Sequence, residues 1–258
     1  MILRRRRAST GLGAPPAPHD DQVRARLAAA RGVADATPGV LARLDLAPAG
    51  YVLTQSSSDL ARHAALLEPR PAAEEVRILV TPGRAAGTWN LDVATFDRPG
   101  LLARVAGALL HAGVDVVQAV VATWEDGAAL QALVVSGAVA PDATELQAAI
   151  AWSLEAPLAA PPVAGAVVAF DPPSGSYTGC EVVAADRPGL LHAIAVAIAL
   201  AGADIHAARV ATEAGTARDR FDLTDQQGRP LAPGARSTIA DHLRNGAREP
   251  VPTRRPRP

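Results

Sequence analysis

The hexapeptide Asp-Arg-Pro-Gly-Leu-Leu occurs twice, at Asp97–Leu102 and at Asp186–Leu191, and its residue types could bind an anion. A helix N-terminus offers free backbone N–H groups and a partial positive charge to a carboxylate. The glycine leaves the backbone open to close approach, and the arginine adds a positive charge. The structural alternative is a capped turn, in which Asp97 accepts hydrogen bonds from the free N–H groups and Pro99 takes the first helical position. Residue types alone favour this alternative, which leaves only the arginine of each copy unexplained.

Both copies lie within a longer duplication. They are 89 residues apart, and residues 97–123 and 186–212 are identical at 15 of 27 positions without a gap. The shared positions include Gly113 and Gly202, which suit a left-handed helix C-cap. An ungapped match of this length indicates a tandem repeat.

The elements that must position the two hexapeptides follow the same order in each repeat. Alternating or continuous apolar runs predict strands, and a 3.6-residue period predicts helices. In the first repeat we expect strands at 77–81, 88–96, 114–123 and after a turn at 124–127, with helices from 101 and at 142–154; in the second, strands at 166–170, 177–185, 203–212 and after a turn at 213–215, with helices from 190 and at 234–245. The predicted fold class is α+β, with two antiparallel four-stranded sheets and helices on one face of each.

Composition excludes several kinds of chemistry. All 25 basic residues are arginine, so no lysine nucleophile and no lysine-dependent phosphate loop can form. Cys180 is the single cysteine, which rules out an intramolecular disulfide, and its place in a predicted strand indicates an inert buried thiol. No two histidines have a metal-ligand spacing. We therefore expect no catalytic residue, no metal and no cofactor. The formal net charge of −1 predicts neither a nucleic-acid nor a membrane partner.

Changes in composition along the chain suggest its organisation. We expect a disordered arm and short helix at 1–47, a connector at 48–75, the two repeats at 76–160 and 161–246, and a disordered tail at 247–258. The short helix of the arm is predicted at 21–36. Within the connector, a strand is predicted at 51–55 and a helix at 59–67, with Ser58 as its N-cap.

The repeats resemble a known family. The hexapeptide between a strand and a helix, followed by the pattern Gly-x-Asp-Ile-x-x-Ala, resembles the ACT domain, a ligand-sensing ferredoxin-like module of βαββαβ order. The second repeat continues as ATEAGTARDRFDLTDQQGRPL, which resembles the end of the paired C-terminal ACT domains of bifunctional PII uridylyltransferases. The matches there are Thr212, Ala217, Asp219, Phe221, Asp225, Gly228 and Leu231. The connector sequence YVLTQSSSDLARHAALL is similar to the segment that precedes that pair.

The resemblance implies an amino-acid site at each hexapeptide loop, where two ACT units lie side by side. The implied ligand-binding residues are Asp97, Arg98, Gly100 and Leu101 in the first repeat and Asp186, Arg187, Gly189 and Leu190 in the second, with Asp115 and Asp204 placed to face a neighbouring unit's loop. The uridylyltransferases sense glutamine, so glutamine is the favoured ligand. In the first repeat Gln131 replaces Asp219 and Leu133 replaces Phe221, so we expect the first site to be the weaker.

Three functions follow from the resemblance. The first is a cytoplasmic, non-enzymatic amino-acid sensor with a regulatory protein partner, which assembles as a homo-oligomer through sheets or helix faces. The second is the regulatory portion or remnant of a PII uridylyltransferase, because the nucleotidyltransferase and HD phosphohydrolase domains do not fit into the 47 residues before the connector. The third is a dimerisation module whose loops bind no ligand.

Overall fold

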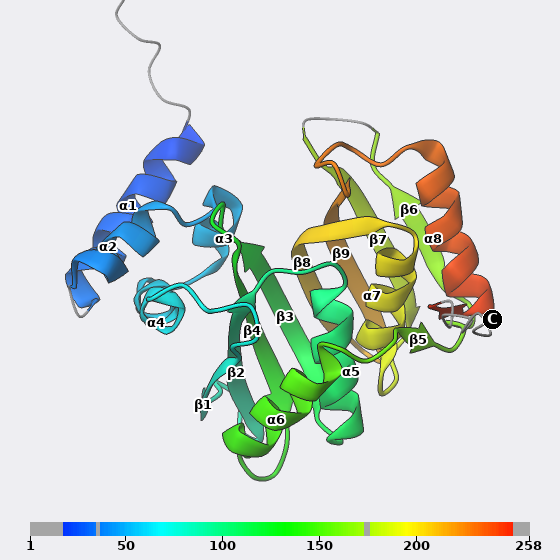
Figure 1. Cartoon of the computed structure of the whole chain (residues 1–258), viewed down its shortest axis with the longest axis horizontal. Coiled ribbons are helices and arrows are strands. Elements are labelled where there is room, and N and C mark those ends of the chain that lie inside the picture. Colours follow the sequence, from blue (N-terminus) through cyan, green and yellow to red (C-terminus); the bar gives the residue numbers. More distant parts are fainter. Residues whose placement is uncertain (1–17, 35–36, 173–175, 250–258) are drawn as a thin grey trace, which may run out of the picture.

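An eight-stranded antiparallel sheet forms the centre of the computed structural model, which describes residues 18–34, 37–172 and 176–249 (Figure 1). The strand order is β1-β2-β4-β3-β8-β9-β7-β6. The strands are β1 (Arg77–Pro82), β2 (Thr88–Phe96), β3 (Asp115–Thr123), β4 (Ala128–Ser136), β6 (Val167–Phe170), β7 (Thr178–Ala185), β8 (Ala203–Glu213) and β9 (Thr216–Asp225). The arm and tail predicted as disordered fall mostly at 1–17 and 250–258, outside the described residues.

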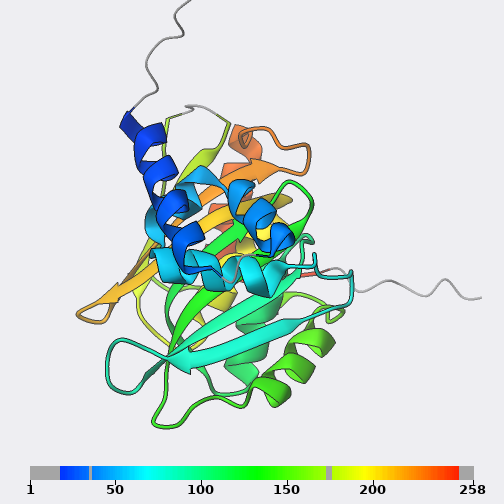
Figure 2. The ribbon, with the colours of Figure 1, turned by 90° about the vertical axis from the view of Figure 1, so that its left-hand side faces the viewer.

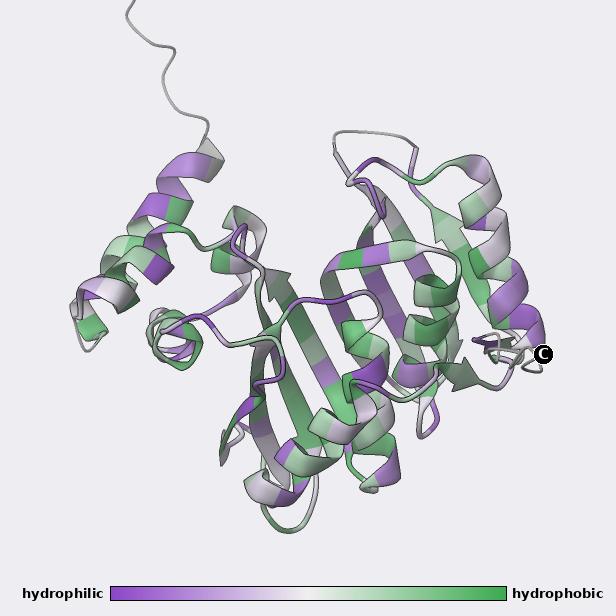
Figure 3. Cartoon of the chain, viewed as in Figure 1, coloured by the Kyte–Doolittle hydropathy of each residue, from purple (hydrophilic) through white to green (hydrophobic). Residues whose placement is uncertain are grey.

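Helices cover both faces of this sheet. They are α1 (Pro18–Val33), α2 (Pro38–Asp45), α3 (Ala49–Thr54), α4 (Ser57–Leu67), α5 (Leu101–His111), α6 (Ala143–Ser153), α7 (Leu190–Leu200) and α8 (Pro233–Asn245). The last four form one layer over the sheet, and α5 and α7 at its centre are largely hydrophobic (Figure 3). Their leucine, isoleucine, valine and alanine side chains join those of both units in one continuous core.

The two repeats share their sheet, since β3 of the first unit pairs with β8 of the second from Gln118↔Ala211 to Ala122↔Ala207. The predicted α+β class with two four-stranded units is confirmed, but the two sheets are continuous rather than separate. In each unit the edge strand comes first, as a hairpin with the next strand, so the order is ββαββα. Among the described residues, α6 and α8 are each followed directly by a short strand, β5 (Ala159–Ala160) and β10 (Ala247–Arg248), and these two pair with each other.

The N-terminal helices cover the opposite face of the first unit (Figure 2). A second apolar cluster forms there around Tyr51 and Val52 of α3, whose side chains are buried. The strand predicted at 51–55 is therefore wrong: burial in a helical layer outweighs the β preference of these residues. The following helix is confirmed, but its N-cap is Ser56, which accepts a hydrogen bond from the Asp59 backbone N–H, and not Ser58.

Buried polar groups attach this helical layer to the sheet. Nε2 of His63 lies 3.1 Å from Asp92 Oδ1 of β2, and Arg62 Nε donates to Oδ2 of the same carboxylate at 2.9 Å. Tyr51 hydroxyl contacts Nδ1 of His63 at 2.5 Å. Asp92 is thus satisfied by two side chains of α4, as a buried carboxylate requires.

Both hexapeptide turns end on a left-handed glycine. Gly100 (φ 72°) and Gly189 (φ 77°) are the N-caps of α5 and α7, and no side chain caps either helix. The predicted capping role of Asp97 and the helical position of Pro99 are therefore wrong, because the chain closes a turn through the Leu101 N–H and Arg98 carbonyl before the helix begins. The predicted left-handed glycines after both helices, Gly113 and Gly202, are confirmed.

Candidate functional site

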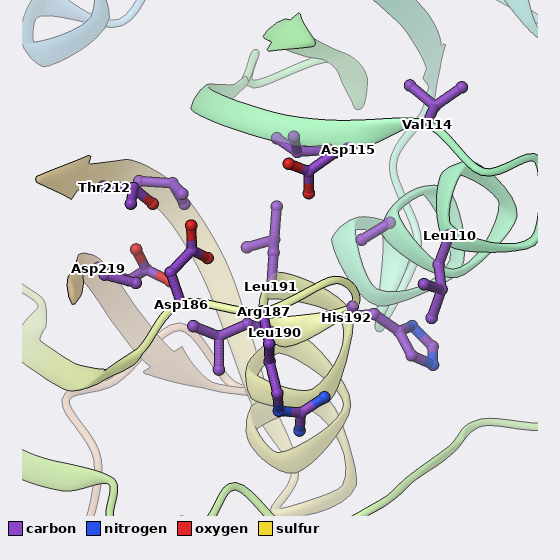
Figure 4. Close-up of a pocket in the computed structure, with 15 residues that line it drawn as sticks. Leu110, Val114, Asp115, Asp186, Arg187, Leu190, Leu191, His192, Thr212 and Asp219 are labelled. Carbon is purple, nitrogen blue, oxygen red and sulfur yellow. The ribbon is translucent and has the colours of Figure 1, made fainter. Parts of the chain in front are cut away.

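Two cavities lie where the two units meet. The Asp186 site is the cavity between the loop before α7 and Asp115, which opens β3 of the other unit (Figure 4). The Asp97 site is the cavity between the loop before α5 and Asp204 near the start of β8. The pairing of β3 with β8 creates both, because it brings the start of each strand beside the other unit's loop.

All ten predicted site residues line these two cavities. At the Asp186 site they are Asp186, Arg187, Gly189, Leu190 and Asp115. At the Asp97 site they are Asp97, Arg98, Gly100, Leu101 and Asp204. The structure therefore brings each loop together with the strand-opening aspartate of the other unit, as the resemblance implied.

The arginines of the two loops point elsewhere. Arg98 donates to Glu155 at 2.9 Å and to the Ala73 carbonyl. Arg187 donates to the Pro162 carbonyl at 3.2 Å, and in Figure 4 its side chain extends away from the aspartates of the cavity. The expectation that arginine assists anion binding thus finds no support in this arrangement.

The first turns of α5 and α7 lie at the cavities, since Leu102 and Leu191 are among the lining residues. The first N–H groups of a helix have no partner within the helix, and here no side chain replaces one. Leu101 and Leu190 donate back to Arg98 and Arg187, respectively, which leaves the next N–H groups of each turn for a ligand. These groups and the helix dipole favour an anion such as a carboxylate.

The loop glycines admit side chains of the neighbouring elements. A Cβ at Gly100 would lie 2.9 Å from Leu158 Cδ1 and 3.3 Å from the Cβ of Ala199 in α7. A Cβ at Gly189 would lie 2.7 Å from Cδ2 of Leu110 in α5. Apolar side chains of the neighbouring elements therefore occupy the space beside each glycine that was expected to be open to a ligand.

One buried polar residue of each site was not predicted. Asp219 of β9 lines the Asp186 site, and Gln131 of β4 lines the Asp97 site. They occupy equivalent positions in the two repeats, on the sheet face that carries the helices. A comparison of the two repeats already shows this difference, because Asp219 and Gln131 stand at the same position of otherwise similar strands. His206, which also lines the Asp97 site, carried no such signal.

Carboxylates dominate the electrostatics of both sites. Burial raises the pKa of Asp97 and nearby Asp204 raises it further, while His206 lowers it in part. Burial likewise raises the pKa of Asp115, and Asp186 adds to the rise. For Asp219, burial raises the pKa to about 7; the nearby backbone N–H of Ala211 offsets part of the rise, and Asp186 adds to it. Both sites therefore attract a cationic group.

The cavities are small as they stand. The cavity volume is about 30 Å³ at the Asp186 site and about 70 Å³ at the Asp97 site. Each has room for a few water molecules, so a larger ligand must displace side chains or extend into solvent. The roomier cavity belongs to the first repeat, which was expected to hold the weaker site.

Other kinds of site have less support. Within the described residues no group of three or more histidine, cysteine, aspartate or glutamate side chains could hold a metal ion. No helix among the described residues is long and apolar enough to cross a membrane. Burial raises the pKa of the Cys180 thiol to about 12, so the thiolate that would react is scarce.

Comparison with known proteins gives a consistent relationship. The bifunctional uridylyltransferase/uridylyl-removing enzyme of Rhodospirillum rubrum is 30% identical over 235 residues, which cover 81% of this chain and 25% of that protein. The enzyme of the same name from Bradyrhizobium diazoefficiens is 32% identical over 205 residues, covering 70% of this chain and 22% of that protein. No family model matches the chain. Among solved structures, aspartate kinase from Synechocystis is similar over 66% of this chain and 29% of its own, with a TM-score of 0.36 and 18% identity.

The relationship concerns only part of those enzymes. The chain spans about a quarter of the length of the curated relatives that it matches, and no catalytic domain is evident among the described residues. The α+β fold and these sequence matches together identify the chain as an ACT-like regulatory portion related to part of the bifunctional uridylyltransferase/uridylyl-removing enzyme.

Proposed function

We propose that the chain is a non-catalytic regulatory module that binds free amino acids at the two sites between its units, with glutamine among the ligands. The observation that carries this proposal is the pairing of opposite chemistries in each cavity. An uncapped helix N-terminus suits an α-carboxylate, and an aspartate of the other unit, Asp115 or Asp204, suits an α-ammonium. A zwitterion complements both ends at once.

Because the ligand is larger than the cavity, its binding changes how the two units pack. Since each cavity has room for only a few water molecules, we expect a bound amino acid to move side chains such as Leu110 or Leu158 that pack on the loop glycines. Those side chains connect the two units, so the bound and free forms differ in how the units pack. A ligand that favours one packing shifts the population toward it. The regulatory protein that reads this shift, and a cytoplasmic location, stay predictions.

A thermal-shift screen of the full chain against the common L-amino acids tests the proposal. A ligand at about 100 times its Kd stabilises the native state by about 2.7 kcal/mol, which raises the melting temperature by several degrees. We expect glutamine to do so, and its analogue without the α-amino group to have little effect. The proposal fails when no common amino acid at millimolar concentration moves the transition.

A second function, self-association, has support from the helical layer. A mainly apolar groove of about 570 Å³ lies between α5 and α6, and Trp152 at its edge is 75% exposed. An exposed tryptophan beside an apolar groove is typical of a protein contact. We expect Trp152→Glu to shift a dimer to monomer in sedimentation equilibrium, whereas Val139→Glu, an equally exposed position before α6, leaves the assembly unchanged. A wild-type chain that sediments as a monomer would exclude this function.

A further inference from the structure

The two sites differ most at one buried position. Asp219 lines the Asp186 site and is 1% exposed, and Gln131 lines the Asp97 site and is 2% exposed. The backbone N–H of Ala211 lies near the Asp219 carboxylate, but neither of its oxygens forms a hydrogen bond of normal geometry among the described residues, nor does Oε1 of Gln131. Buried polar atoms are nearly always hydrogen-bonded. Each of these side chains therefore lacks a donor that a ligand could supply.

The Asp186 site carries an excess of negative charge. Asp115, Asp186 and Asp219 line the same cavity, as Figure 4 shows. The two lining residues that could carry positive charge, Arg187 and His192, form hydrogen bonds with main-chain carbonyl groups instead. A single α-ammonium group carries one positive charge and cannot neutralise three carboxylates. The site can therefore take a second cationic group.

The Asp97 site is closer to balance. It is lined by two carboxylates, Asp97 and Asp204, together with the amide of Gln131 and the imidazole of His206. His206 Nε2 lies 2.7 Å from Thr224 Oγ1, which holds the ring beside the cavity. One α-ammonium group and the helix N-terminus leave only the neutral Gln131 oxygen without a donor.

We propose that the Asp186 site selects an amino acid with a cationic side chain, whose terminal nitrogen binds Asp219, whereas the Asp97 site selects an amino acid with a neutral hydrogen-donating side chain, which binds Gln131. The proposal rests on the proposed function, because it assigns side-chain choice to sites that hold the α-carboxylate and α-ammonium groups. The two repeats are then sensors of two different ligand classes.

Protonation of Asp219 should make the affinity for a cationic ligand depend on pH. Burial holds the pKa of Asp219 at about 7, so the free protein binds a proton there that a cationic side chain must displace. Asp186 and Asp115 face Asp219 from the loop and from β3, and Arg187 and His192 also line the cavity. Affinity for a cationic amino acid should therefore increase about ten-fold as the pH rises from 6 to 8, while affinity for glutamine stays nearly constant.

Isothermal titration calorimetry of the full chain with L-lysine and L-glutamine tests the proposal. We expect Asp219→Asn, which keeps the size of the side chain, to weaken lysine binding about ten- to hundred-fold without changing glutamine binding. Gln131→Leu, which removes the hydrogen-bond acceptor, should weaken glutamine binding about ten-fold and leave lysine binding unchanged. The pH series on the wild-type chain needs no variant, so it gives a result even when a variant fails to fold.

The outcomes separate the two proposals. Lysine binding that survives Asp219→Asn overturns the proposal, as does a lysine affinity with no pH dependence or equal binding of glutamine at both sites. Each of these results leaves amino-acid sensing intact. Failure of both lysine and glutamine to bind, with no other amino acid active in the thermal-shift screen, overturns the proposed function and this inference with it.

Discussion

Replacing Gly100 by alanine is expected to lower the free energy of unfolding by about 2–5 kcal/mol. Two effects add. An alanine at φ 72° carries a left-handed strain of about 1–2 kcal/mol. Its Cβ would also lie 2.9 Å from Leu158 Cδ1 and 3.3 Å from the Cβ of Ala199, and overpacking a filled interior costs about 1–3 kcal/mol. Leu158 is buried and Ala199 belongs to a helix, so neither yields easily.

Gly113→Ala is the matched control, because it changes the glycine at the other end of the same helix. Gly113 has nearly the same backbone conformation, φ 69°, but a Cβ at this position would meet no atom within 4 Å. We expect the free energy of unfolding of this variant to fall by about 1–2 kcal/mol, which is the cost of the left-handed strain alone. Urea unfolding followed by circular dichroism measures both. Equal losses of unfolding free energy for the two variants would mean that the neighbouring unit does not pack against Gly100.

The result bears on how the two repeats communicate. A larger loss at Gly100 would show that Ala199 of the second unit and Leu158 after α6 pack on the first unit's loop in solution. Any ligand at the Asp97 site would then act on the contact that joins the units. The hexapeptide's glycine was expected to make room for a ligand, and its packing role explains instead how a ligand at this loop would move the other unit.

Much of the fold was predictable because the duplicated segment has strong local signals. The strand at 88–96 and the helix at 142–154 agree with β2 and α6 within one residue at each end, and Asp142 caps the helix where the sequence predicted its start. The segment at 51–55 failed because tertiary burial decided its conformation. The helix begins at Leu101 as expected, and only the alternative that placed Pro99 at its first position failed, because proline suits a turn as well as a first helical position.

The site was predictable to the level of loops and strand starts. Asp115 and Asp204 were placed correctly because the resemblance supplied the side-by-side geometry. The continuous sheet formed by β3 and β8 was not predictable, since pairing between repeats leaves no periodic signal in either strand. Asp219 and Gln131 were noticed as a difference between repeats, but their burial without a partner depends on packing that only the structure contains.

Asp219→Asn is expected to make stability less dependent on pH. The pKa of Asp219 is about 7 in the folded protein against 3.8 for an ordinary aspartate. The stability that protonated Asp219 contributes is complete below about pH 3.8 and is lost as the pH rises through about 7. Linkage gives a wild-type loss from this group of about 2–3 kcal/mol between pH 5 and pH 8. The variant has no carboxyl proton to lose at this position. Its free energy of unfolding should therefore rise relative to that of the wild type by about 2–3 kcal/mol between pH 5 and pH 8.

Urea unfolding of both proteins near pH 5 and near pH 8 measures this gain. Asp222→Asn is the control for the loss of a carboxylate from this strand, because Asp222 lies on the same strand but only half-buried on the opposite sheet face. A buried carboxylate kept without a partner destabilises the free protein, which is understandable when a ligand supplies the missing donor. If instead Asp219→Asn is neutral at both pH values, Asp219 is already satisfied in the free protein, and the reason to assign it a cationic ligand disappears.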